Sequence, residues 1–454
     1  MSLGDIQVRS KESNIGDAGL LAMPRSLPPW TRHFPTWFAP FLTHFRHRAQ
    51  RTWAPLYVRG LCSAAHRKSM QPLAAVVAPG KEDHIQQFIT DSPWSTGPLE
   101  TLLAQRAEEM LGGKDAVLII DDTCLTKFGT KSVGVARQYS GQVGKITTCQ
   151  CLVSLTLAQH ELPVPVALRL FLPQEWTHDP ARLGAAGVPL EHQLPQTKWE
   201  LALKELDRVS EHVTFGMVLA DAGYGVNAQF RHALTERGLL WSVGITRTQT
   251  VYPKDVRLIP IPKHFRGRRP KYPTTSHDRQ TVEEVLNGAA WQHLVWRHGT
   301  KGPLSGRFAA VYVRLADGDE NAQGQHLPGQ GAWVIGEQRR GEERKYYTCN
   351  LPPETPFPRL IEVTKRRWAC ELTHRELKEE VGLDHFEGRS WQGLHHHAVL
   401  CMVALNFLQW LRLSQPDDLQ GDTVPAIRAE VAGDLPLPPQ CRQCRACTAL
   451  FSGP

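Results

Sequence analysis

Apolar residues over 31–112 recur at the spacing of amphipathic helices. Phe38 and Phe41 follow a helical repeat, and basic residues lie beside them. Further helices are predicted over 84–89 and 99–110. The pattern predicts a small helical domain whose basic edge either binds DNA or is simply the solvated face of a helical bundle.

The periodicity changes at residue 115 from helical to strand-like. Residues 116–120 form a continuous apolar run, as in a buried strand. The pattern then predicts more strands, interrupted by two amphipathic helices. The predicted order is strand 116–120, strand 146–157, strand 164–170, helix 198–209, strand 214–220, helix 227–237 and strand 239–245.

This order of elements determines which strands are neighbours. Three strands followed by helix, strand, helix and strand is the ribonuclease H-like arrangement, in which the first and fourth strands lie side by side. Asp121 and Asp122 close the first apolar run, and Asp221 follows the fourth. We therefore expect Asp121 and Asp221 to emerge next to each other at the ends of two strands.

Beyond residue 246 the alternation of strands and helices stops. Short strand-like pieces between Gly- and Pro-rich turns predict a β-rich insertion. Helical periodicity returns over 360–380, and a last apolar helix over 398–413 is expected to pack on the sheet. The predicted fold class is α/β, with a disordered N-terminal segment (1–30), a helical and DNA-binding domain (31–112), two parts of a ribonuclease H-like core (113–246 and 348–415), a β-rich insertion between them (247–347) and a Pro/Cys-containing tail (416–454).

Composition describes an ordinary globular protein with a modest basic excess. The chain of 454 residues is 41% hydrophobic and 21% charged, with a net charge of +7. The excess favours a polyanionic partner without proving one. No run of 18 or more apolar residues and no secretory leader stand out, so we expect no membrane partner and a cytoplasmic location.

Ten cysteines occur, and most lie inside apolar runs, where a free thiol behaves as a small hydrophobic side chain in a reducing compartment. Cys441, Cys444 and Cys447 are the exception, because their spacing is one that zinc sites use. A fourth ligand is not evident. Zn²⁺ at these three cysteines and a reduced tail without metal both stay open.

Three carboxylates far apart in the sequence suit a pair of divalent metal ions. Asp121 and Asp221 follow predicted strands, and Glu371 lies on a predicted helix. Two Mg²⁺ or Mn²⁺ ions need hard oxygen ligands, and such ions activate an attacking oxygen and stabilise a leaving one. Strand alternation decides whether Asp121 or Asp122 points inward; we prefer Asp121, with Asp122 as second choice. A single aspartate of this kind more often caps a helix or turn.

The predicted helix around Glu371 carries basic residues on the same face. Arg367 precedes the glutamate by four residues, and Arg375 and Lys378 follow it by four and seven. Such a row suits the phosphate backbone of a nucleic acid. A solvated helix with internal salt bridges explains the same charges.

Here the spacing resembles a known signature. Arg367-x3-Glu371-x6-Lys378 matches the last three residues of Tyr-x2-Arg-x3-Glu-x6-Lys, the signature of one branch of bacterial insertion-sequence DDE transposases. In that branch a β-strand insertion also precedes the glutamate. The tyrosine position holds Thr364, which departs from the signature. Asp121-Asp122-Thr123 resembles the family's Asp-x-Thr motif and supports Asp121.

The resemblance implies a DNA transposase, a metal-dependent polynucleotidyl transferase and endonuclease. Its metal-bound triad would be Asp121, Asp221 and Glu371, with Arg367 and Lys378 on DNA phosphates. Water would cut at the element's ends in Mg²⁺, and the freed 3′-hydroxyl would attack target DNA. The family also implies a homodimer in the DNA complex, and a bacterial, nucleoid-associated location.

A second basic stretch lies in the predicted insertion. Arg266, Arg268 and Arg269 stand among Gly and Pro residues, as in loops that enter the minor groove of DNA. We expect them to contact phosphates or a groove.

The stretch after the first strand also carries candidate contacts. Arg137, Tyr139 and Lys145 could touch substrate or serve only the structure of a hairpin.

Two other functions stay open. One is a catalytically inactive transposase derivative that only binds DNA. The other is a ribonuclease H-like nuclease that cuts without joining.

Overall fold

The computed structural model describes residues 30–141, 143–261, 273–299, 302–320, 325–414 and 423–433. Two predictions lie wholly outside these ranges: groove contact by Arg266, Arg268 and Arg269, and zinc at Cys441, Cys444 and Cys447. The predicted disorder over 1–30 and the predicted tail 416–454 lie mostly outside them. Within the tail, 423–433 is described and contains α15 (Val424–Gly433), a helix that the sequence pattern did not predict.

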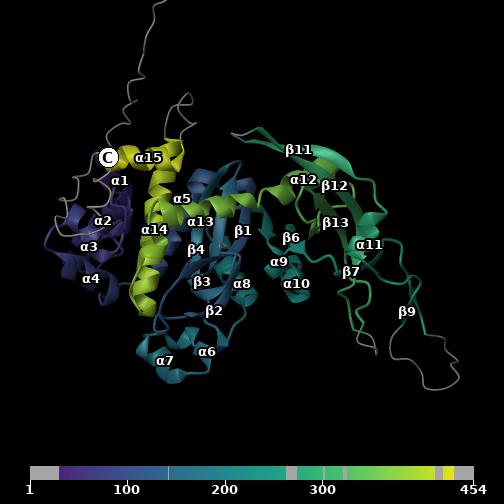
Figure 1. Cartoon of the computed structure of the whole chain (residues 1–454), viewed down its shortest axis with the longest axis horizontal. Helices are drawn as coiled ribbons and strands as arrows, with labels where there is room; N and C mark the ends of the chain where they lie inside the picture. Colours follow the sequence, from purple (N-terminus) through teal and green to yellow (C-terminus); the bar gives the residue numbers. More distant parts are fainter. Residues whose placement is uncertain are drawn as a thin grey trace, which may run out of the picture.

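The N-terminal part is helical, as predicted. It comprises α1 (Trp30–Leu42), α2 (Arg48–Leu61), α3 (Met70–Val77), α4 (Glu82–Thr90) and α5 (Gly97–Leu111). These helices gather around the long α14 (Trp391–Leu413) from the other end of the chain (Figure 1). Their buried aromatic and aliphatic residues share one hydrophobic core with α14.

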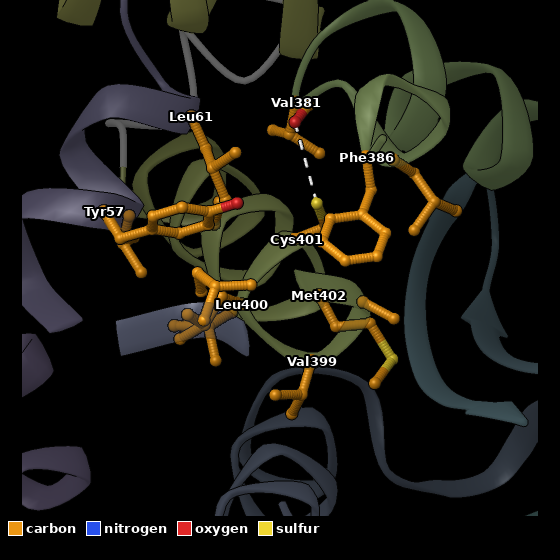
Figure 2. Packing of buried hydrophobic residues seen from close by; sticks show 14 of the residues in the cluster. Tyr57, Leu61, Val381, Phe386, Val399, Leu400, Cys401 and Met402 are labelled. Carbon is orange, nitrogen blue, oxygen red and sulfur yellow. Dashed lines mark hydrogen bonds between the residues drawn. The ribbon is translucent and has the colours of Figure 1, made fainter. Parts of the chain in front are cut away.

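Figure 2 shows this shared packing from close by. Tyr57 and Leu61 of α2 lie against Leu400 and Cys401 of α14, all of them buried. The Tyr57 hydroxyl reaches Nδ1 of His397 at 2.8 Å. On the side facing the sheet, the side-chain amides of Asn406 and Gln409 in α14 donate to proline carbonyls of β4 (Leu162–Leu170). The predicted packing of the last helix on the sheet is confirmed, and the same helix also completes the core of the N-terminal helices.

One twelve-stranded sheet organises the rest of the described chain. Its first half contains β1 (Gly113–Thr126), β2 (Ala136–Ser140), β3 (Lys145–Gln159), β4, β5 (Phe215–Ala220) and β6 (Trp241–Ile245). β3 runs antiparallel to β1 and also pairs with β4 and β2. β5 lies parallel to β1 and to β6. The prediction that the first and fourth predicted strands, 116–120 and 214–220, lie side by side is confirmed.

The first strand is longer than predicted. It does not end at residue 120 but continues through Asp121 and Asp122 to Thr126. The reason is its partner β3, whose antiparallel ladder extends from Val117↔Ala158 to Thr126↔Cys149, so the two aspartates interrupt the apolar run without ending the strand. The expectation that Asp121 stands at a strand end is therefore wrong, whereas Asp221 does follow the end of β5.

The predicted β-rich insertion consists of strands that extend the same sheet. β14 (Lys345–Cys349) pairs with β6, and β13 (Gly331–Gln338), β12 (Gly302–Leu315) and β7 (Thr250–Pro253) follow outward. The smaller elements are β10 (Gln280–Thr281), β11 (Gln292–Gly299), α11 (Val282–Asn287) and the separate pair β8 (Leu258–Ile259) and β9 (Thr274–Thr275). Figure 1 shows this half extending away from α14.

Helices cover both faces of the sheet around β1. On one face, α8 (Lys198–Ser210) and α10 (Ala228–Glu236) pack on even-numbered residues of β1 such as Ile120. On the other, α12 (Phe357–Lys365) and α13 (Trp368–Glu379) pack on odd-numbered residues such as Ile119. The helical run predicted over 360–380 is thus two helices, divided at Arg366 and Arg367.

Short helical elements complete the described structure: α6 (Gln174–Thr177), α7 (Pro180–Ala185), η1 (Leu190–His192), α9 (Ala222–Gly225) and η2 (Leu383–His385). In the part of the chain that the structure describes, no helix combines the length and apolarity that crossing a bilayer requires.

Glu376 makes the stability of this fold depend on pH. Its side chain on α13 is 4% exposed, and burial raises its pKa to about 7 against the opposing charges of Arg412 and Arg375. Its protonated form stabilises the fold below the ordinary carboxyl pKa, and that contribution is lost as pH rises through about 7. We expect the free energy of unfolding of Glu376→Gln, relative to that of wild type, to be roughly 2–3 kcal/mol higher at about pH 8 than at about pH 5.

Urea unfolding at the two pH values measures this change. Glu379→Gln, an exposed glutamate on the same helix, is the matched control and should follow the wild-type dependence. A parallel dependence for Glu376→Gln and wild type would contradict the expectation.

Candidate active site

The parallel pairing of β1 and β5 brings two predicted aspartates together. Ile120 of β1 lies opposite Ala220 of β5, and Asp121 and Asp221 are the next residues of the two strands. Asp221 caps the short helix α9, where its side chain accepts a hydrogen bond from the Tyr224 amide at 3.3 Å. α9 lies against β6 because Gly244 has no side chain; a Cβ there would lie 2.7 Å from the Ala222 nitrogen.

Arg367 connects Asp121 to the predicted helical glutamate. At the start of α13, its Nη1 donates to Oδ2 of Asp121 at 2.5 Å, and its Nη2 donates to Oε1 of Glu371 at 2.6 Å. The thiol of Cys370 adds a contact to Asp121 at 3.1 Å. One guanidinium therefore bridges two of the three predicted carboxylates, while the Glu371 side chain stays 61% exposed.

Asp122 lies on the opposite face of β1, as strand alternation requires. Its carboxylate accepts from Lys198 Nζ at 2.6 Å and from the Tyr224 hydroxyl at 2.5 Å. Both partners belong to the side of the sheet covered by α8, not by α13. Asp121, and not Asp122, therefore shares its face with Glu371.

The electrostatics of the two adjacent aspartates favour a bound cation. Burial and the charge of Asp121 raise the pKa of Asp221 to about 6, against the opposing effect of Arg367. Burial also raises the pKa of Asp121, and Arg367 is its largest opposing influence. Two half-buried carboxylates that repel each other are stabilised by positive charge placed between them.

His374, one turn beyond Glu371, is held in its neutral form. Burial and the charge of Lys378 lower its pKa to about 3. The Ser154 hydroxyl donates its one hydrogen to the Asp121 carbonyl at 2.9 Å. Ser154 Oγ therefore accepts a hydrogen bond from His374 Nε2 at 2.6 Å. This chain of hydrogen bonds fixes α13 against β3 behind the carboxylates.

The carboxylates open into a cavity of about 1300 Å³. Its acidic lining residues are Asp121, Asp122, Asp221, Glu371, Glu379 and Asp384. Its basic lining residues are Lys68, Lys198, Arg367, Arg375, Lys378 and Arg428, with His66, His374 and His385. Predicted residues from β1, β5 and α13 are thus brought together, and the connection between α2 and α3 closes one side.

Some lining residues were missed by sequence reasoning. Lys198 and Tyr224 hold Asp122, but neither stands at a spacing that links it to the aspartates. Lys68 and Arg428 come from segments outside the predicted core. Thr364, at the signature's tyrosine position, is buried and donates to the Leu360 carbonyl at 2.7 Å, and it does not line the cavity.

The donor set of this cavity suits a divalent cation, although the side chains are not arranged as ligands. Among the described residues, no group of three or more His, Cys, Asp or Glu side chains is placed to hold a metal ion. Arg367 occupies the space between Asp121 and Glu371 instead. Carboxylate oxygens are the ligands that Mg²⁺ and Mn²⁺ prefer, and the raised pKa values of Asp121 and Asp221 indicate a need for positive charge.

Comparison with known proteins identifies the family. Residues 40–303, more than half of the chain, match the family described as DDE superfamily endonuclease. The chain therefore belongs to this family, and its predicted resemblance to insertion-sequence DDE transposases is confirmed. The matched range includes Asp121 and Asp221 and ends before Glu371.

One individual protein is similar to about half of the chain, and another to most of it. A protein of Microchaete diplosiphon named as a probable transposase for the insertion sequence element IS701 is 27% identical over 242 residues, which are 52% of this chain and 60% of that relative. A piggyBac transposase, seen in a synaptic complex with hairpin DNA, has a TM-score of 0.43 and 10% identity over 88% of this chain and 75% of its own.

Proposed function

We propose that this protein is a DNA transposase. It cuts DNA at the ends of its element in the presence of divalent metal and joins the freed 3′-hydroxyl to target DNA. The observation that carries the proposal is one cavity in which Asp121, Asp221 and Glu371 meet a set of lysine and arginine side chains. Membership in the DDE superfamily endonuclease family supports the same chemistry.

The three carboxylates are the proposed holders of two Mg²⁺ or Mn²⁺ ions. When bound, the ions would activate the attacking oxygen and stabilise the leaving oxygen of the phosphodiester. The sheet order β4-β3-β1-β5-β6, with β3 antiparallel to its neighbours, supports a ribonuclease H-like core for this site. In this core Asp121 belongs to β1, and Asp221 directly follows the neighbouring parallel strand β5.

The basic residues of α13 are the proposed phosphate contacts. Arg375 is exposed on the cavity side of α13, and Lys378 lines the same cavity one turn later. DNA is the proposed partner, and the helical segment 31–112 is the proposed DNA-binding domain. A homodimer is the proposed assembly on DNA, because both ends of an element must be brought together before joining.

Arg367 has a second proposed role as the counter-ion of the cation-free site. It must release Asp121 and Glu371 before either carboxylate can bind a metal ion. We expect Arg367→Gln to bind Mn²⁺ about 10-fold more tightly than wild type, because the cation no longer competes with two charge-assisted hydrogen bonds. Calorimetric titration with Mn²⁺ alone measures the affinity.

Arg375→Gln is the matched control for this prediction. It removes the same charge from the same helix and cavity, but Arg375 is exposed and does not bridge the carboxylates. An equal gain in Mn²⁺ affinity for both variants would mean that net charge, not release of Arg367, sets the affinity.

The test of the proposed function uses the DNA that flanks the coding region. Labelled duplexes carrying its inverted repeats are incubated with the protein, Mg²⁺ and a target plasmid. We expect nicks at the repeat ends and joining of the labelled strand to the plasmid. Cutting without joining would instead identify a nuclease, and binding without cutting would identify an inactive derivative.

A further inference from the structure

An exposed apolar pair stands on the hairpin formed by β2 and β3. Tyr139 and Ile146 lie directly opposite each other in the ladder, and they are 64% and 59% exposed. Directly opposed residues of an antiparallel pair project from the same face. Two large side chains of this kind, left in solvent on one face, form a small apolar platform.

The platform lies on the same face of the sheet as Asp121. Asp121 pairs with Ser154 of β3, and Ser154 and Ile146 are separated by an even number of residues on that strand. Tyr139 also lines the cavity that contains Asp121 and Glu371. Its ring therefore stands at the edge of the site where the proposed cleavage occurs.

The backbone that carries Tyr139 is anchored. The Cys124 thiol contacts the Tyr139 carbonyl at 3.8 Å, and the side-chain amide of Gln138 donates to the Cys149 carbonyl at 3.1 Å. The next residue, Ser140, is buried. A fixed backbone with an exposed ring presents the ring for contact with a ligand at little cost in ordering.

The charges around the platform indicate what the ligand is. Arg137 lies two residues before Tyr139 on the same face and is exposed. Arg375 and Lys378 line the same cavity as Tyr139. An aromatic face beside several cations suits a nucleotide, because the base stacks on the ring while the phosphate meets the cations.

Within a duplex, only an unpaired base can use such a platform, because both faces of an interior base are covered by its neighbours. Stacking on a side chain then requires the base to leave the helix or to lie in a single strand.

We propose that Tyr139, with Ile146 beside it, stacks an unpaired nucleobase of the DNA strand that enters the cavity. The proposal rests on the proposed function, which supplies the DNA, and adds a subsite to it. Tyr139 acts as a binding residue here and takes no part in the chemistry at the phosphate.

The experiment compares two forms of one DNA end. One is a duplex that continues past the element's end into paired flanking DNA, and the other carries the same end with its last few bases unpaired on the cleaved strand. We expect Tyr139→Ala to weaken binding of the unpaired form about 10- to 100-fold and to leave binding of the continuous duplex unchanged. Tyr139→Phe keeps the aromatic face and should bind both forms like wild type.

Phe128→Ala is the control for loss of an exposed aromatic ring. Phe128 is fully exposed after β1 but does not line the cavity, so its removal should affect neither DNA form. Equal binding of the unpaired form by Tyr139→Ala and wild type, or an equal loss on both forms, would overturn the stacking role alone. Failure of the wild-type protein to bind either form would overturn the proposed function as well.

Discussion

We expect Asp121→Asn, Asp221→Asn and Glu371→Gln each to lower the rate of DNA cleavage at least about 10³-fold. Removal of a metal-holding carboxylate withdraws several kcal/mol of transition-state stabilisation, and about 4 kcal/mol corresponds to that factor. The amides keep the volume of the side chains but not their charge. The rate of nicking of an end-containing duplex in Mg²⁺ measures the effect.

Two variants in the same cavity control for a general change of charge. Glu379→Gln removes an exposed carboxylate from the helix that carries Glu371. Asp122→Asn changes a carboxylate that Lys198 and Tyr224 hold on the opposite face of β1. Both should cut far faster than the triad variants. A Glu371→Gln protein that cuts like Glu379→Gln would remove Glu371 from the triad.

Combinations of triad substitutions test whether the carboxylates act as one unit. If they hold the same ions, Asp221→Asn with Glu371→Gln should cut no more slowly than either single variant. If the fold-losses of the two single variants multiply in the double variant, the two residues contribute independently to the rate of cleavage. The Arg367 bridge between Asp121 and Glu371 favours the first outcome.

The neighbouring strands of the site could be predicted because the relevant information is local. Each apolar run is visible in the sequence, and the order of runs and helices leaves few arrangements of the sheet. The adjacency of Asp121 and Asp221 follows from that order and is observed in the pairing of β1 with β5. The placement of Glu371 beside them rested on helical spacing and on the family resemblance.

Other features depend on partners that are remote in the sequence. β1 continues past Asp122 because β3 supplies a ladder there, which the polar residues of β1 do not reveal. Lys198 is in the cavity because α8 crosses that face of the sheet. The strands after β6 extend the same sheet only because β14 pairs with β6. None of these pairings has a spacing that could be recognised in one sequence.

The largest expected loss of stability concerns a buried charge cluster that does not line the cavity of the three proposed catalytic carboxylates. Arg169 of β4 donates to Glu100 of α5 at 2.9 Å and to Glu205 of α8 at 2.8 Å, and all three are buried. Burial raises the pKa of Glu205, but the charges of Arg169 and Arg208 outweigh it and lower this pKa to about 2. The cluster joins the N-terminal helices to both the sheet and its covering helix.

We expect Arg169→Met to lower the free energy of unfolding by about 3 kcal/mol or more at neutral pH. Glu100 and Glu205 then face each other as buried carboxylates without their shared cation, and breaking such a pair commonly costs 3–5 kcal/mol, about the range expected here. Arg208, which contacts Glu205 at 2.7 Å and Glu100 at 3.6 Å, offsets part of the loss. Urea unfolding at neutral pH measures the change.

Two further measurements separate charge from packing. Because the folded-state pKa of Glu205 is depressed, its contribution is present above the ordinary carboxyl pKa and is lost as pH falls toward about 2. The gap between Arg169→Met and wild type should therefore narrow in acid. Adding Glu100→Gln and Glu205→Gln to Arg169→Met should recover most of the stability, since no buried carboxylate is left without its cation. Arg208 loses both carboxylate partners in this variant, but its side chain is 26% exposed and keeps contact with water. If the triple variant is as unstable as Arg169→Met, the guanidinium stabilises this junction through the space it fills rather than through its charge.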